Sequence, residues 1–142
     1  KIALVVELLL LGVFVMNLAD QEGENESAAA VCEQVRQADN RCCKLLENPV
    51  VENRDKVLSD IKTYIDSLDP LIQCIENDRS AVLEACKDLI DDKPRGSKYM
   101  IIPFDFFKLM EGFNWTETNM ATLLELRRTT MDKWTVIDKL LD

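Results

Sequence analysis

Apolar residues recur every three or four positions through most of this chain, and this spacing restricts its fold more than any other feature. One face of an α-helix repeats about every 3.6 residues, so the spacing predicts amphipathic helices. The 142 residues include four glycines and four prolines, which leaves few of the turns that a many-stranded sheet needs. We therefore expect an all-α fold, a compact bundle of four to five helices.

Three helices are expected in the first two thirds of the chain. The first runs from Ala28 to Glu47 and is ended by Asn48-Pro49, because the residue before proline avoids the helical conformation. The second covers residues 51–68. The third begins at Pro70, since proline suits the first position of a helix. Residues 77–80 are polar side chains that compete for backbone hydrogen bonds, and they are expected to interrupt this third helix.

The last third of the chain has a different pattern. From Asp91 to Pro103 the helical spacing fails in a stretch with two prolines and one glycine, which predicts an exposed loop. A short helix or turn rich in phenylalanine is expected at 104–113. A long amphipathic helix then opens at Asn114, where Asn114 and Glu117 have the spacing of a capping box. Its apolar stripe is expected to comprise Met120, Leu124, Met131, Trp134, Ile137 and Leu141, interrupted by Arg127.

An almost unbroken apolar run occupies residues 1–19, and an acidic segment follows at 20–27. This layout predicts a secretory signal peptide, an acidic linker and one helical domain at 28–142, so that the domain is secreted and disulfide-permissive. Two alternatives stay open because Glu7 lies inside the run. One is a membrane anchor, for which the run is short, and the other is a buried core helix. Membrane contact is expected only if 1–19 is retained.

Five cysteines lie in the expected helices: Cys32, Cys42, Cys43, Cys74 and Cys86. In a secreted chain they predict disulfide cross-links. At about 1.5 Å per residue, Cys32 and Cys43 are about 16.5 Å apart along the first helix, which resembles the spacing of about 18 Å from Cys74 to Cys86. Parallel helices would pair Cys32 with Cys74, and Cys42 or Cys43 with Cys86. Antiparallel helices would pair Cys32 with Cys86 and Cys43 with Cys74.

Cys42 and Cys43 are not expected to bridge each other, because neighbouring helical side chains point in different directions. One member of this vicinal pair is then left over, which predicts a covalent homodimer. The alternative is a set of five reduced, buried thiols. No metal site is expected, since the chain has neither histidine nor a C-x-x-C motif.

Catalytic chemistry is not indicated by the sequence. Without histidine the commonest general base is missing, and no glycine-rich phosphate loop is present, so we expect no enzyme activity and no cofactor. The net charge of −9, from 26 acidic against 17 basic residues, disfavours nucleic acid as a partner.

Two kinds of candidate site are nevertheless expected. Asn25 and Asn114 open N-glycosylation sequons, although Asn114 has an alternative role in capping a helix. Aromatic and methionine side chains predict either the closed end of a core or a surface for a hydrophobic ligand or a partner. This set comprises Phe104, Phe106, Phe107, Met110, Phe113, Trp115 and Trp134.

These observations favour a secreted, non-enzymatic interaction protein, cytokine-like or effector-like, that binds a receptor or a second copy of itself. The alternative is a carrier that holds a fatty acid, a sterol or a similar ligand between its helices. A second alternative, a membrane-anchored subunit, requires residues 1–19. The cysteine spacing matches neither insect odorant-binding proteins nor secretoglobins, and four-helix cytokines have no strict cysteine signature, so no family is assigned.

Overall fold

The computed structural model describes residues 28–91, 97–101 and 104–142. These residues are mainly helical and form no strand, which confirms the all-α prediction for this part of the chain. The apolar run, the acidic linker and Asn25 lie outside the described residues. None of the helices within the described ranges has the length and apolar character that crossing a membrane requires.

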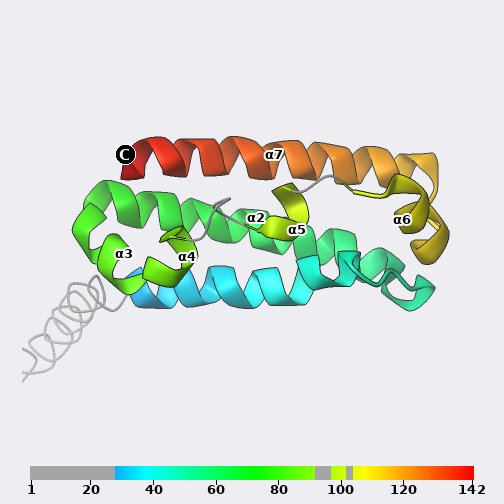
Figure 1. The fold of residues 1–142 in the computed structure, drawn as a ribbon, viewed down its shortest axis with the longest axis horizontal. Coiled ribbons are helices and arrows are strands. Elements are labelled where there is room, and N and C mark those ends of the chain that lie inside the picture. Colours follow the sequence, from blue (N-terminus) through cyan, green and yellow to red (C-terminus); the bar gives the residue numbers. More distant parts are fainter. Residues whose placement is uncertain (1–27, 92–96, 102–103) are drawn as a thin grey trace, which may run out of the picture.

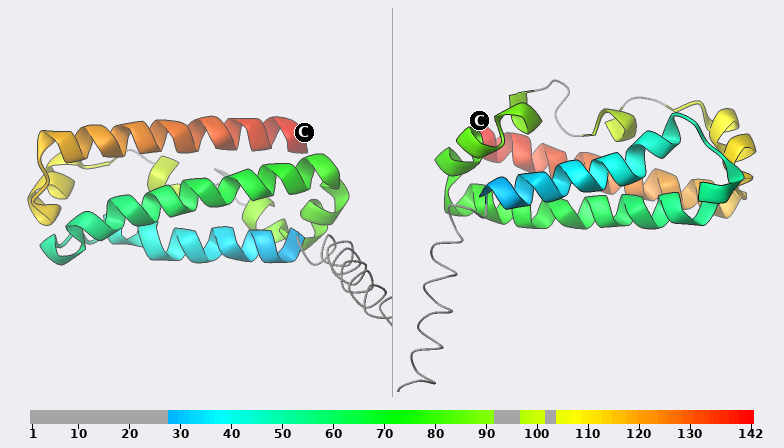
Figure 2. Two further views of the ribbon diagram at one scale, coloured as in Figure 1. Left: turned by 180° about the vertical axis from the view of Figure 1, so that it is seen from behind. Right: turned by 90° about the horizontal axis from the view of Figure 1, so that it is seen from below.

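Three long helices form the body of the molecule (Figure 1). The N-terminal helix covers residues 28–42 and continues into the 3₁₀ turn η1 (Cys43–Leu46). A second 3₁₀ turn, η2 (Val51–Asn53), leads into α2 (Arg54–Asn77), and the last helix is α7 (Glu117–Leu141). The N-terminal helix runs antiparallel to α2, whereas α2 and α7 run in the same direction (Figures 1 and 2).

Because α2 and α7 are parallel, the chain between them has to return along the whole bundle. The short helices α3 (Arg79–Ala85) and α4 (Lys87–Asp91) turn at one end, and α5 (Lys98–Ile101) lies over the middle. At the other end α6 (Phe106–Phe113) leads into α7. Three long helices with short helical segments therefore replace the four to five helices that we expected, and that count is not confirmed.

The predicted break at Pro70 is wrong. Helix α2 continues from residue 54 to residue 77 with Pro70 inside it, although proline removes one backbone donor and usually kinks a helix. Leu68 and Leu71 on either side are fully buried, and their packing favours a continuous helix. The chain breaks instead at Asp78, within the predicted 77–80 interruption, where the Asp78 side chain accepts a hydrogen bond from the Ala81 backbone N–H and caps α3.

The start of α7 also differs from the prediction. Its N-cap is Thr116, which forms a capping box with Asn119, so the box expected at Asn114 and Glu117 is wrong. Asn114 instead ends α6, in the left-handed backbone conformation with φ 54° that asparagine tolerates better than most residues.

The buried face of α7 matches the predicted stripe at four of six positions, since Met120, Trp134, Ile137 and Leu141 are buried. Leu124 and Met131 are exposed, and the neighbouring Leu123 and Thr130 are buried in their place. Thr130 can occupy the core because its hydroxyl donates a hydrogen bond of 2.9 Å to the Leu126 carbonyl. The apolar pattern alone therefore gave the wrong residue at these two positions.

Candidate functional site

One disulfide links distant segments. Cys32 of the N-terminal helix is bridged to Cys86, which lies where α3 ends and α4 begins. Their Cα atoms are 5.8 Å apart, and neither residue is exposed. The pairing is the first of the two in the antiparallel alternative, and it ties the return segment to the start of the bundle.

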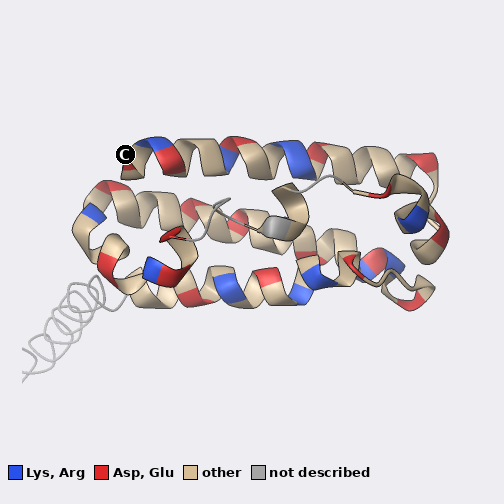
Figure 3. Ribbon diagram, in the orientation of Figure 1, with Lys and Arg blue, Asp and Glu red and all other residues tan. Residues whose placement is uncertain are grey.

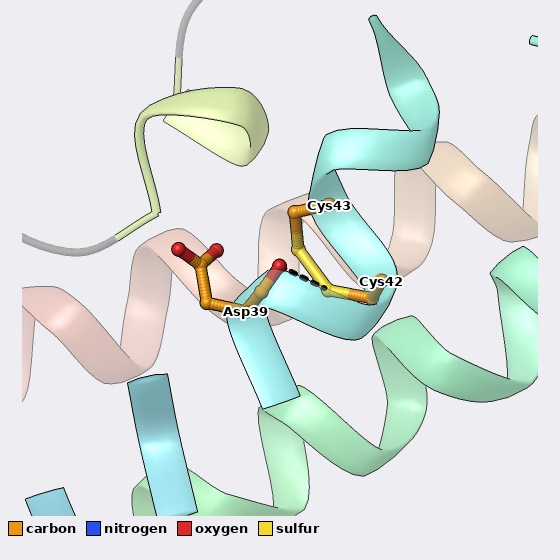
Figure 4. A group of neighbouring side chains, drawn as sticks. All are labelled: Asp39, Cys42 and Cys43. Atoms are coloured by element: carbon orange, nitrogen blue, oxygen red, sulfur yellow. Dashed lines mark hydrogen bonds between the residues drawn. A yellow bond between two sulfur atoms is a disulfide. The ribbon is translucent and has the colours of Figure 1, made fainter. Parts of the chain in front are cut away.

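The second disulfide joins neighbours. Cys42 and Cys43 are bridged, against our expectation, at the point where the N-terminal helix becomes the turn η1 (Figure 4). The prediction from helical side-chain directions was therefore wrong, since the two Cα atoms are 3.7 Å apart and the bridge closes between adjacent residues. Cys74 is half-buried near the C-terminal end of α2 and is in neither bridge, so the predicted pairing of Cys43 with Cys74 does not form. The cysteine outside the two bridges is thus Cys74, whereas we predicted a member of the vicinal pair.

Asp39 lies one helical turn before this pair (Figure 4). Its side chain is half-buried, and one carboxylate oxygen and the two Sγ atoms all lie within 4.8 Å of one another. Cys42 Sγ is also 3.8 Å from the Asp39 carbonyl oxygen. A carboxylate and two sulfurs are thus grouped in a mostly buried position. Their spacing of three and four residues is the sequence signal for this grouping, and our predictions did not use it.

A buried polar contact connects the long helices at mid-bundle. The Tyr64 hydroxyl of α2 accepts a hydrogen bond of 2.9 Å from Trp134 Nε1 of α7 and another of 3.0 Å from the Ser97 backbone N–H. Burial raises the pKa of Tyr64 above its usual value. Trp134, which we predicted to lie either in the core or in a binding surface, is therefore part of the core.

The predicted aromatic set separates into three groups. Trp134 is joined in the core by Phe113 and Trp115, which stack with ring centroids 4.5 Å apart, while the Trp115 indole N–H donates to the Arg54 carbonyl. Phe104 and Met110 are half-buried. Phe106 and Phe107 are exposed.

Arg127 holds the return segment against α7. Its guanidinium donates hydrogen bonds of 2.9 and 3.0 Å to the carbonyls of Met100 and Ile101, and it lies 5.1 Å from the centroid of the Phe104 ring. Arg127 interrupts the apolar stripe of α7 because its side chain binds the return segment.

The end of the bundle formed by η2, α6 and the start of α7 is here called the open end (Figure 2). A shallow cavity of about 420 Å³ lies there between the turn that precedes η2 and α6. It is lined by Asn48, Pro49, Asp105, Phe107, Lys108, Glu111 and Gly112. The Gly112 backbone lies so close to the turn that a Cβ atom would be 2.6 Å from the Pro49 carbonyl oxygen.

Apolar side chains stand out around this cavity. Phe107 is 86% exposed, and Phe106, Val50 and Val51 are exposed beside it. The sequence indicated the two phenylalanines but not the valines, which lie outside any helical stripe. The Lys108 ammonium donates a hydrogen bond of 2.9 Å to the Glu47 carbonyl oxygen. Figure 3 shows residues of both charges along the long helices and around α6.

The opposite end is here called the cross-linked end and comprises the start of the N-terminal helix, α3, α4 and the end of α7. Besides the Cys32–Cys86 bridge, Arg36 donates two hydrogen bonds to Asp88, which lower the pKa of that carboxyl. Arg79 donates to the Leu141 carbonyl and ties α3 to α7.

Asn114 is exposed at the junction of α6 and α7, and its side chain is accessible for glycan attachment. The hydroxyl of Thr116, the third sequon residue, takes part in the capping box.

Comparisons of the chain with protein-family models, with curated proteins and with solved structures found no match in any of the three.

Proposed function

We propose that this chain is a secreted, non-enzymatic helical interaction protein whose open end binds a segment of a protein partner. The observation that carries the proposal is the exposure of Phe107 beside an open cavity of about 420 Å³. Removing such a side chain from water is favourable by roughly 1.5 to 3 kcal/mol, so covering Phe107 would contribute to the free energy of binding a partner.

The charges around the cavity suggest the chemistry of that segment. Among the described lining residues, Asp105 and Glu111 are acidic and Lys108 is the only basic one, so the lining carries a net charge of −1. An acidic rim favours an apolar anchor flanked by Lys or Arg in the partner. A second copy of this chain fits less well, since each copy carries a net charge of −9.

The carrier alternative has less support. Three of the side chains that were expected to line a ligand cavity, Phe113, Trp115 and Trp134, instead pack against each other or against Tyr64 and are buried. The cavity at the open end is shallow and lined mainly by polar residues, whereas a lipid carrier needs an enclosed apolar pocket.

Selection from a displayed library of random peptides tests the binding proposal. We expect enriched peptides to share a large apolar residue beside Lys or Arg, and Phe107→Ala to weaken their binding at least tenfold. Leu124→Ala is the matched control, because Leu124 is exposed on α7 away from the cavity, and it should change nothing. Peptides that bind Phe107→Ala as well as the unchanged protein would overturn the proposal.

Secretion and glycosylation belong to the same proposal and have their own test. The intact mass of natively produced protein, with and without reductant, should show loss of residues 1–19 and glycan mass at Asn25 or Asn114. The same measurement would reveal a covalent homodimer, the alternative to a foreign partner, as a doubled mass that reductant halves. An unprocessed chain with five alkylatable thiols would contradict the secreted assignment.

A further inference from the structure

We infer that Cys42, Cys43 and Asp39 form a redox-gated site for a thiophilic divalent cation such as Zn²⁺. In the bridged state the two sulfurs bind each other and the site is closed. After reduction by a dithiol, the two cysteines and the Asp39 carboxylate supply three ligands to the ion. This site is separate from the open end and does not depend on the proposed function.

The distances suit such an ion. Zn²⁺ binds sulfur at about 2.3 Å and carboxylate oxygen at about 2.0 Å, so two sulfur ligands of one ion are at most about 4.6 Å apart. The three candidate ligand atoms lie within 4.8 Å of one another, close to the span that one ion requires. We propose that small side-chain rotations after reduction bring them onto one ion, and three protein ligands leave the fourth position to water.

The surroundings suit a bound metal ion. The two cysteines are fully buried, so the metal-bound thiolates would be shielded from water. Asp39 is half-buried beside them, and Cys42 Sγ is 3.8 Å from its carbonyl oxygen, so the three residues stay grouped in either redox state.

The bridge contributes little to holding the fold, which leaves it available for this chemistry. A disulfide stabilises mainly by restricting the unfolded chain, and neighbouring residues are close in the unfolded chain already. Reduction transfers two electrons and two protons from the dithiol to the pair, and the dithiol closes to a disulfide. Binding of the divalent ion then releases the two thiol protons.

Zinc binding to the reduced and the oxidised protein tests the inference, with Cys74→Ser as the starting protein so that this thiol is not counted. Competition with a chromophoric chelator should give one Zn²⁺ per reduced chain and none per oxidised chain. Asp39→Asn should weaken binding roughly 10- to 100-fold, within the range known for altered metal sites. Asp60→Asn, at a half-buried acid of α2, is the matched control and should leave affinity unchanged.

A second test, alkylation of the cysteines, uses the protein without any substitution. Zn²⁺ should protect Cys42 and Cys43 of the reduced protein from iodoacetamide, read by mass spectrometry, while Cys32 and Cys86 gain no protection. Protection of Cys32 and Cys86 instead, or one Zn²⁺ bound by Cys42→Ala/Cys43→Ala, would overturn the inference. So would equal affinity of Asp39→Asn and the starting protein.

Discussion

The two ends of the bundle are built on different principles. The cross-linked end has a disulfide between segments 54 residues apart and the Arg36–Asp88 ion pair. The open end is held by packing and by single hydrogen bonds such as that from Trp115 to the Arg54 carbonyl, and it exposes Phe107. The difference indicates that a disulfide fixes the end where α2 turns into the return segment, while the other end leaves apolar surface exposed.

The largest expected effect compares the two bridges. In Cys42→Ala/Cys43→Ala, which keeps the Cys32–Cys86 bridge, reductant should lower the free energy of unfolding by about 4 kcal/mol, because that bridge spans 54 residues. In Cys32→Ala/Cys86→Ala, which keeps the bridge between neighbours, the loss should be under about 1 kcal/mol. Urea unfolding of each variant with and without reductant, in the presence of a chelator, measures both. Equal losses would break the comparison.

Two phenylalanines of α6 have different roles at the open end: Phe113 is buried in the core, and Phe107 is exposed. Phe113→Ala should lower the free energy of unfolding by about 3 kcal/mol or more, because its ring is fully buried against Trp115. Phe107→Ala should change it by under about 0.5 kcal/mol. Urea midpoints of the two variants give the answer, and a destabilised Phe107→Ala would show that this ring supports the fold.

The middle of the bundle should respond to alkaline pH. Burial raises the folded-state pKa of Tyr64 above its unfolded value of 10.0, so above pH 10 the unfolded chain loses a proton that the folded chain keeps. Stability from this group is complete below pH 10 and falls as pH rises, by up to about 1.4 kcal/mol per pH unit. Unfolding measured between about pH 9 and 11 should show a shallower fall for Tyr64→Phe. Identical slopes would contradict the assignment.

The smallest effect concerns the ion pair of the cross-linked end. Hydrogen bonds from Arg36 lower the folded-state pKa of Asp88, so its contribution is present above the ordinary value of 3.8 and is lost as pH falls through the folded pKa. Because the Asp88 side chain is 69% exposed, we expect under about 0.5 kcal/mol. Asp88→Asn compared with the unchanged protein at about pH 6 and about pH 3 measures it. If Asp88→Asn lowered the free energy of unfolding as much as loss of the Cys32–Cys86 bridge does, our ranking of the bridge above the ion pair would be wrong.

Helices were predicted correctly where the spacing of apolar side chains determines the structure. They were predicted poorly where a single tertiary contact determines where a helix ends. The all-α class followed from apolar spacing, and the break near Asp78 followed from its polar neighbours. Pro70 was misread because its effect on a helix depends on the packing of Leu68 and Leu71, which no local pattern contains.

The candidate sites show the same limit. Phe107 and Trp134 belong to one composition class, yet one is exposed and the other is hydrogen-bonded to Tyr64 in the core. Asp39 precedes Cys42 and Cys43 by three and four residues, a spacing that brings side chains together on one face of a helix, and our predictions did not use this signal.

The positions of the bridged cysteines have a consequence for the order of synthesis. All four lie between residues 32 and 86, and the chain contains no cysteine after Cys86. The covalent framework can therefore be completed while the part of the return segment after Cys86 and all of α7 have yet to leave the ribosome. Helix α7, which supplies Trp134 to the core, then joins segments that are already cross-linked, and it is held there by non-covalent contacts with α2.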